Sequence, residues 1–132
     1  MHNAKYHHFH DGPKSVAPYS HAVEVGDLLI LTGQMPFLPD GSVPDGIEAQ
    51  TRAVIANLMT VKARAGFADA DIVSARVFLT KFERHYERMN KVYAAHFPEE
   101  AYPARTCVGV TALAAGCDIE IDFIVARRRQ TP

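Results

Sequence analysis

The pattern of hydrophobic and polar positions begins with two short β-prone runs, 21–25 and 28–32, which a Gly-Asp pair separates. Two such runs joined by a two-residue turn are typical of a β-hairpin, because glycine accepts the positive φ that the turn requires. A shorter strand is expected before them, near 6–9. The stretch 33–46 contains three prolines and two Asp-Gly pairs. These residues indicate a long surface loop.

Two later segments repeat their apolar residues every three or four positions, which is the period of an amphipathic helix. The first begins at a capping-box-like pair, Asp45 and Glu48, and ends at Gly66. Its apolar stripe consists of Ile47, Thr51, Val54, Leu58, Val61 and Ala65. The second ends before Pro98, and its stripe consists of Phe82, Tyr86, Met89, Tyr93 and Phe97. Aromatic and Met residues at this spacing are usually buried, so we expect core rather than a cofactor site.

Three further strands are expected in the second half of the chain, at 72–79, 104–111 and 117–126. The last run alternates apolar residues with acidic ones, a period typical of a half-buried strand. We expect the last two runs to pair as a hairpin in the register that places their apolar residues on the same face. A slip of one residue would bury the acidic residues.

The expected hairpin brings chemistry-bearing side chains together on its polar face. Arg105 and Cys107 would lie roughly opposite Glu120 and Asp122. The planar guanidinium of Arg105 suits bidentate capture of a carboxylate or phosphate, or alternatively an ion pair with Asp122. Glu120 is a candidate general acid or base if partial burial moves its pKa towards neutrality, and otherwise a cross-strand ion-pair partner.

The order of elements, strand-strand-strand-helix-strand-helix-strand-strand, predicts a mixed sheet with two helices on one face. The other face needs a cover and is expected to be a subunit interface with polar clefts, carrying Arg105 and Glu120. A length of 132 residues suits one domain, 1–132. Within it we expect a variable N-terminal segment, 1–17, and a basic tail, 127–132.

Composition narrows the class of protein. With 48% hydrophobic and 22% charged residues, the chain is not expected to be disordered. Its net charge of −1 argues against nucleic acid or an anionic membrane as a partner. No apolar run of about 18 residues and no secretory signal are found, so we expect a cytoplasmic protein without a membrane span. Two cysteines without a CxxC pair are typical of a reducing compartment.

Other possible chemistry is weaker. The early histidines, which suggest a metal cluster by composition alone, are His2, His7, His8 and His10. We expect them to belong to a loose, solvated terminus, and we expect no metal site. Ser20 and His21 are adjacent on a strand and point to opposite faces, so they form no dyad. Cys107 is expected to be a buried, inert thiol rather than a nucleophile. The basic run 127–129 is expected to be a solubilising terminus rather than an RNA contact.

Four separated motifs carry a resemblance. They are Ala17-Pro18-Tyr19-Ser20, Thr32-Gly33-Gln34-Met35-Pro36, Met89-Asn90-Lys91-Val92-Tyr93, and Tyr102-Pro103-Ala104-Arg105-Thr106-Cys107-Val108-Gly109-Val110 with Asp118-Ile119-Glu120-Ile121. In this order they resemble the RidA family, also called YjgF/YER057c/UK114 or endoribonuclease L-PSP. The resemblance implies a chorismate-mutase-like α+β fold with a mixed six-stranded sheet and two helices on one face. It also implies a homotrimer with ligand pockets between subunits.

The resemblance further implies an activity without a cofactor. Members similar to this chain hydrolyse reactive enamines and imines of amino acids, such as 2-aminoacrylate and 2-iminopropanoate, to 2-oxo acids and ammonia. By that resemblance Arg105 would clamp the substrate carboxylate, and Glu120 would position or activate the water. The other substrate-binding residues that it implies are Tyr19, from a neighbouring subunit, Gly33, Asn90 and Cys107.

Three alternatives stay open. They are a pathway enzyme similar to 2-aminomuconate deaminase, a non-catalytic protein that binds 2-oxo acids, and an endoribonuclease or translation inhibitor. The near-neutral charge argues against the last. Substrate identity is also open because the chain departs from the family pattern. His21 stands where many members have glutamine, Ala17 where many have glycine, and 113–115 lacks a frequent proline.

Overall fold

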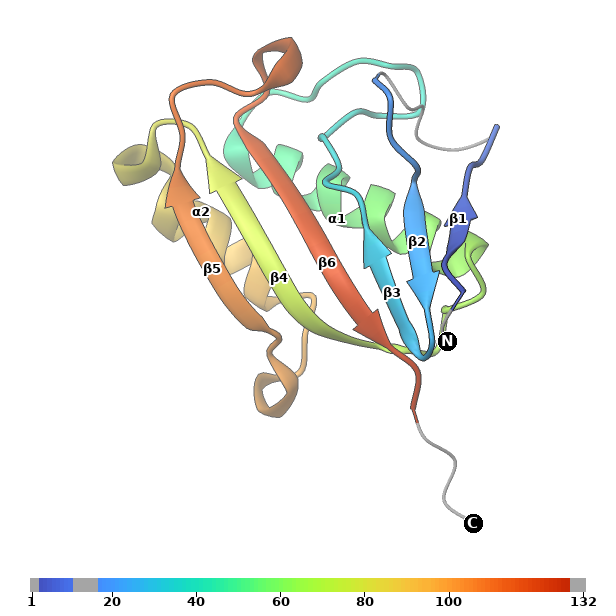
Figure 1. Cartoon of the computed structure of the whole chain (residues 1–132). Helices are drawn as coiled ribbons and strands as arrows, with labels where there is room; N and C mark the ends of the chain where they lie inside the picture. Colours follow the sequence, from blue (N-terminus) through green and yellow to red (C-terminus); the bar gives the residue numbers. More distant parts are fainter. Residues whose placement is uncertain (1–2, 11–16, 129–132) are drawn as a thin grey trace.

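Six strands form one sheet, and both helices cover the same face of it (Figure 1). The computed structural model describes residues 3–10 and 17–128. Its strands are β1 (Lys5–His7), β2 (Ala22–Val25), β3 (Leu28–Leu31), β4 (Asp71–Leu79), β5 (Ala104–Gly109) and β6 (Ile119–Ala126). Its helices are α1 (Ile47–Arg64) and α2 (Phe82–Ala94), with short 3-10 turns at Glu99–Ala101 and Ala114–Gly116. The predicted order of elements and the α+β class are confirmed.

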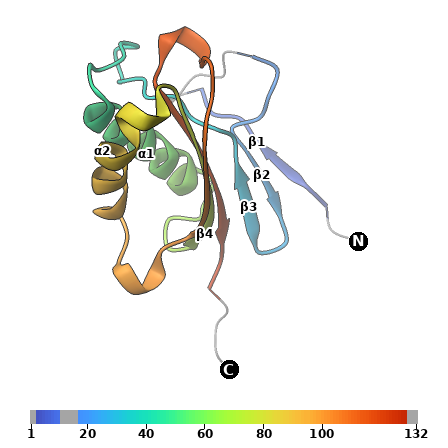
Figure 2. The same cartoon turned by 90° about the vertical axis from the view of Figure 1, so that its left-hand side faces the viewer.

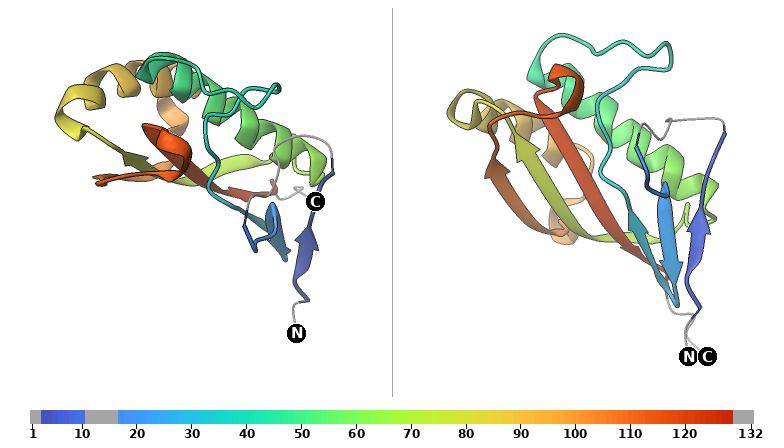
Figure 3. Two further views of the ribbon diagram at one scale, coloured as in Figure 1. Left: turned by 90° about the horizontal axis from the view of Figure 1, so that it is seen from above. Right: turned by 45° about the horizontal axis from the view of Figure 1, so that its top comes forward.

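The helices leave one face of the sheet open. Figure 2 shows the sheet nearly edge-on with α1 and α2 on one side, and the left view of Figure 3 shows both helices along the top with the strands below. The strand order is β1-β2-β3-β6-β4-β5, and only β4 and β5 run parallel. Two crossover helices on one side of a mixed sheet are therefore confirmed.

The first hairpin forms as predicted. Val25 pairs with Leu28 across the turn, and Gly26 has a φ of 58°, in the region that glycine adopts without strain. The short strand β1 pairs with β2, close to where it was expected.

The predicted hairpin of the last two strands is wrong, because β4 lies between β5 and β6. Val77 of β4 pairs with Cys107 on one side and with Ile121 on the other. The strand β4 also has one buried face, so it can pair with β6 in an antiparallel ladder. The helix α2 then forms the crossover connection from β4 to β5, which pairs with β4 in parallel. Matching apolar faces limit the register of a strand pair but not the choice of partner.

The core lies between the helices and the covered face. Its largest fully buried side chains include Leu29, Ile47, Leu58, Met89, Ile121 and Phe123. The aromatic stripe of α2 packs into this core, as predicted. The predicted capping box of α1 is wrong: the N-cap residue is Gly46, with a φ of 90°, and no side chain caps the helix.

The ends of the described chain match the predicted solvated termini in part: His8, His10, Arg127 and Arg128 are exposed, but several side chains there make contacts that were not predicted. His7 is buried and bonds Glu24, with 3.1 Å between Nε2 and Oε1. The Arg127 guanidinium lies 3.7 Å from the centre of the Phe67 ring, and Arg128 pairs with an aspartate of β4. His2 and Arg129 lie outside the described residues. No helix within the described ranges combines the length and the hydropathy that a bilayer crossing requires.

Candidate functional site

The side-chain alternation along the strands decides which face each predicted site residue occupies. Arg105 of β5 pairs in register with Ala75, which is buried under the helices. Glu120 of β6 pairs with Phe78, three residues further along β4 and therefore on the opposite face. The predicted cluster of Arg105 and Cys107 with Glu120 and Asp122 is therefore wrong, because the sheet separates the two pairs.

Arg105 lies under α2, where three side chains from one side of that helix meet it. Its Nη1 donates a hydrogen bond to Oδ1 of Asn90 at 2.8 Å, and its Nη2 donates to the Tyr86 hydroxyl at 3.4 Å. The guanidinium carbon also lies 4.9 Å from the centre of the Tyr93 ring. Residues 86, 90 and 93 share one side of the helix because they are spaced by four and three.

Two of these contacts were missed at the sequence level. Asn90 and Arg105 were both predicted site residues, and the structure brings them together. Tyr86 and Tyr93 were expected only in the core, yet both also contact Arg105. Their helical spacing from Asn90 was the signal that could have identified them.

Cys107 lies on the same face as Arg105 and is half-buried. Burial raises the pKa of the Cys107 thiol, although the positive charge of Arg105 opposes this shift. A thiol with a raised pKa is a weak nucleophile at neutral pH. The structure thus supports the prediction of an inert side chain, which leaves the backbone of Cys107 as its polar group.

Glu120 lies on the open face beside the loop that follows β3. Gln34 and Ile121 exchange two backbone hydrogen bonds, of 2.9 and 3.3 Å, which hold the loop against β6. A Cβ atom on Gly33 would come within 2.5 Å of Oε2 of Glu120, so any larger residue at position 33 would displace the Glu120 carboxylate. The predicted site residues Gly33 and Glu120 are therefore neighbours.

The surroundings of Glu120 favour its protonated form. Partial burial raises the pKa of the Glu120 carboxyl, the negative charge of Asp122 raises it further, and Arg76 opposes both. A carboxyl with a raised pKa can both accept and donate a proton nearer to neutral pH. Glu120 therefore has the environment of a general acid or base.

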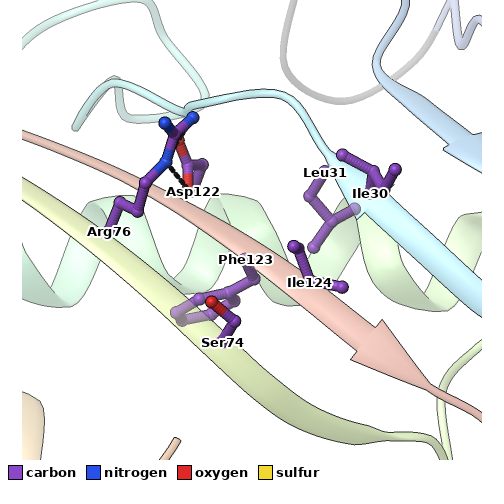
Figure 4. Close-up of a pocket in the computed structure, with 7 residues that line it drawn as sticks. All are labelled: Ile30, Leu31, Ser74, Arg76, Asp122, Phe123 and Ile124. Atoms are coloured by element: carbon purple, nitrogen blue, oxygen red, sulfur yellow. Dashed lines mark hydrogen bonds and ion pairs between the residues drawn. The ribbon is translucent and has the colours of Figure 1, made fainter. Parts of the chain in front are cut away.

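Asp122 forms an ion pair with Arg76. The alternative in which Asp122 pairs with Arg105 is therefore wrong. The Nη2 atom of Arg76 lies 2.8 Å from Oδ2 of Asp122. The pair borders a hollow of about 230 Å³ on the open face, with Ile30 and Ile124 on the other side of it (Figure 4). Arg76 was missed because its contact depends on β4 pairing with β6.

Tyr19 precedes β2 and is half-exposed. The residues after it are tied to the end of β3, since Thr32 donates its hydroxyl to the Ser20 carbonyl and its N–H to the His21 carbonyl. Thr32 is followed by Gly33, so the segment with Tyr19 and the loop beside Glu120 share a common anchor. His21 itself is buried, and its Nδ1 accepts the backbone N–H of Phe9 at 3.2 Å.

The His-rich start of the chain has other contacts. His8 bonds the Ser20 hydroxyl at 3.1 Å, and His7 stacks on Phe9 as well as bonding Glu24. Within 3–10 and 17–128, no group of three or more His, Cys, Asp or Glu side chains is arranged to hold a metal ion.

Known proteins resemble this chain in sequence and in fold. A family described as endoribonuclease L-PSP matches residues 9–127. The 2-iminobutanoate/2-iminopropanoate deaminase of Escherichia coli K12 is 36% identical over 121 residues, which are 89% of this chain and 94% of the relative. The crystal structure of YEO7_yeast superposes with a TM-score of 0.87 at 34% identity, covering 96% of this chain and 100% of that one. Escherichia coli TdcF with bound serine superposes with a TM-score of 0.84 at 30% identity, covering 94% and 99%. The chain therefore belongs to the endoribonuclease L-PSP family, also known as the YjgF/RidA family.

Proposed function

We propose that this protein hydrolyses reactive 2-imino and 2-enamine acids to 2-oxo acids and ammonia without a cofactor. The observation that carries the proposal is the set of partners around Arg105. Within the described residues, both of its hydrogen-bond partners, Asn90 and Tyr86, are uncharged. The guanidinium thus keeps its full positive charge for a carboxylate ligand.

Other arginines of the chain contrast with Arg105. Several form an ion pair with a carboxylate of their own chain; they are Arg76 with Asp122, Arg88 with Glu48, Arg127 with Glu24, and Arg128 with Asp71. An arginine whose charge an aspartate or glutamate already compensates binds an external anion less strongly. The relative from Escherichia coli that is named a 2-iminobutanoate/2-iminopropanoate deaminase supports the same ligand class, as does the serine bound to TdcF.

The complete site needs two subunits in this proposal. Arg105 lies on the covered face of β5, the edge strand, while Glu120 lies on the open face. Large apolar side chains on and near the open face are between 41% and 46% exposed; they are Leu28, Ile30, Val73 and Val108. Exposed apolar groups of this kind are typical of subunit interfaces. We propose a homotrimer in which the open face of one subunit brings Glu120 and Tyr19 to the Arg105 edge of the next.

The proposed mechanism uses little more than orientation and proton transfer. Arg105 binds the carboxylate, and the backbones of Gly33 and Cys107 add polar contacts. The substrate reacts as the protonated imine: water attacks its carbon, Glu120 accepts one water proton, and the C=N bond becomes the C–N bond of a neutral carbinolamine. Glu120 then returns that proton to the nitrogen, the C–N bond breaks and ammonia leaves, while the hydroxyl proton passes to the Glu120 carboxylate as the C=O bond of the 2-oxo acid forms. An enamine enters the same sequence after protonation of its terminal carbon.

Arg105→Ala tests the proposal. An amino-acid oxidase generates the imine, and semicarbazide traps what has not yet been hydrolysed. We expect Arg105→Ala to lose about 2 to 5 kcal/mol of transition-state stabilisation, because truncation removes a charge-assisted contact. Arg52→Ala, on the exposed side of α1, is the matched control and should keep wild-type turnover. Unchanged turnover in a folded Arg105→Ala protein would overturn the proposal.

The same assay separates the alternatives. A non-catalytic binder would take up 2-oxo acids saturably through Arg105 and leave the imine untouched. A pathway enzyme similar to 2-aminomuconate deaminase would hydrolyse 2-aminomuconate in preference to small imines. Ribonuclease activity, which the family description carries, would have to depend on the same site. RNA cleavage that survives removal of Arg105 and disappears on further purification would belong to a contaminant.

A further inference from the structure

Tyr86 packs between the N-terminal turn of α2 and Arg105. Its ring stacks on the Phe82 ring, with 4.7 Å between centroids and an interplanar angle of 25°. Phe82 in turn lies close to β5, since a Cβ atom on Gly109 would come within 3.1 Å of the Phe82 Cβ. The Tyr86 ring therefore has Phe82 on one side and Arg105 on another, and it is partly buried.

The Tyr86 hydroxyl and two aromatic rings restrict the Arg105 guanidinium. The hydroxyl accepts from Nη2 at 3.4 Å, and the guanidinium carbon lies 5.9 Å from the Tyr86 ring and 4.9 Å from the Tyr93 ring. With Nη1 bonded to Asn90, both terminal nitrogens are engaged from the helix side. A guanidinium has five N–H donors, so three of them stay available to a ligand.

Such restraint changes the free energy of ligand binding. A free arginine side chain has about 2 kcal/mol of rotamer entropy, part of which is lost when it binds a ligand bidentately. A guanidinium that is ordered beforehand loses less of this entropy on binding. Neutral partners such as Asn90 and Tyr86 order the guanidinium and leave its positive charge uncompensated. A carboxylate partner would order it but would also compensate its charge.

We propose that Tyr86 is a positioning residue whose hydroxyl and ring hold Arg105 in the orientation that binds the substrate carboxylate. The inference rests on the proposed function, because it assumes that Arg105 receives a carboxylate. It assigns to Tyr86 no contact with the substrate and no proton transfer. Its effect is therefore specific to ligands that carry the carboxylate.

Tyr86→Phe is the informative variant, because it keeps the ring and its stack on Phe82 and removes only the hydroxyl. We measure binding of pyruvate and of its uncharged amide by calorimetry on the full-length protein. We expect the Kd for pyruvate to rise about three- to tenfold, the usual effect of one lost hydrogen bond. The Kd for the amide should not change. In turnover assays KM should rise while kcat stays near the wild-type value, since the lost contact is the same in ground and transition states.

Two matched variants complete the experiment. Tyr6→Phe removes a hydroxyl from a tyrosine that is 65% exposed on β1, and it should bind pyruvate as the wild type does. In an Arg105→Lys background, Tyr86→Phe should have no further effect, because the Nη2 donor is gone. A purely structural role of Tyr86 would instead weaken pyruvate and amide binding alike and lower Tm.

The outcomes distinguish this inference from the proposed function. If Arg105→Ala loses pyruvate binding while Tyr86→Phe keeps wild-type affinity, the positioning role is wrong and the proposed function stands. If Arg105→Ala binds pyruvate normally, both are overturned. A rise in Kd for pyruvate alone, absent in the lysine background, supports the positioning role.

Discussion

The partly buried position of Glu120 lowers the stability of the folded protein at neutral pH and also suits this carboxyl to proton transfer. Its pKa is raised above the usual value of 4.5, so the folded protein holds this proton more tightly than the unfolded chain does. Stability therefore falls as pH rises from about 4.5 through the raised pKa, where the carboxylate must ionise in partial burial. A carboxyl in this state is suited to transfer protons in the proposed reaction.

Glu120→Gln should separate these two effects. Turnover should fall about 10²- to 10⁴-fold, the usual contribution of a general acid or base. Tm should rise relative to the wild type at pH 7 but not at pH 4, because glutamine has no charge to bury. Melting curves at both pH values and imine hydrolysis at pH 7 measure this. A variant less stable than the wild type at pH 7 would contradict the burial argument.

Tyr93 has a buried hydroxyl without a hydrogen-bond partner among the described residues. Burying such a group without a partner costs free energy, whereas its ring is well packed against Phe97, at 4.9 Å between centroids. We expect Tyr93→Phe to leave the free energy of unfolding unchanged or to raise it by up to about 1 kcal/mol. Chemical denaturation measures this. Tyr93→Ala is the matched comparison and should cost about 3 to 5 kcal/mol, since it leaves a cavity.

Among the elements, β1 depends on a side-chain contact as well as on its ladder. The His7 bond lowers the pKa of Glu24, and Arg127 lowers it further. A carboxylate with a lowered pKa stabilises the fold above its usual pKa of 4.5, and this contribution is lost as pH falls through the folded-state value.

Glu24→Gln should therefore destabilise the protein at pH 7 and matter progressively less below pH 4.5. We expect a loss of about 0.5 to 1 kcal/mol at pH 7, because the pair is partly exposed. Thermal melts of both proteins across this pH range give the difference directly. Lys5→Gln, on the exposed part of β1, is the control and should show no such pH dependence. An equal deficit at pH 3 and pH 7 would contradict the role of the Glu24 carboxylate.

Elements with a strong local signal were predicted well. The turn at Gly26 determined the first hairpin, and the stripe through Leu58 determined α1. The start of α1 was predicted less well. Asp45 and Glu48 fit a capping box in sequence, but the N-cap residue is Gly46 and no side chain caps the helix. Local patterns specify which residues form an element more reliably than they specify its ends.

At the scale of the whole molecule, the sheet separates Arg105 from Glu120, so a site that uses both must combine two subunits. Mixing Arg105→Ala and Glu120→Gln proteins tests this. Each variant alone should be inactive. If each site draws one residue from each of two subunits, unfolding and refolding a one-to-one mixture should restore about one quarter of the wild-type sites.

The control is a mixture in which one chain carries both substitutions and the other carries neither. It also restores about one quarter of the sites if these lie between subunits, but about one half if each subunit holds a complete site. A mixture of the two single variants that stays inactive after refolding would overturn the intersubunit site. Sedimentation of the same samples reports whether they are trimers.

From the sequence alone we could predict the elements, the two helices on one face and the motif residues that carry the proposed chemistry. These features depend on short-range periodicity, which a chain shows without any knowledge of its contacts. The position of β4 between β5 and β6 could be seen only in the folded chain, and because of it Arg105 faces α2 while Glu120 faces the open side. Strand neighbours are chosen by long-range packing, because several strands have apolar faces that match and the lowest free energy depends on all of them together.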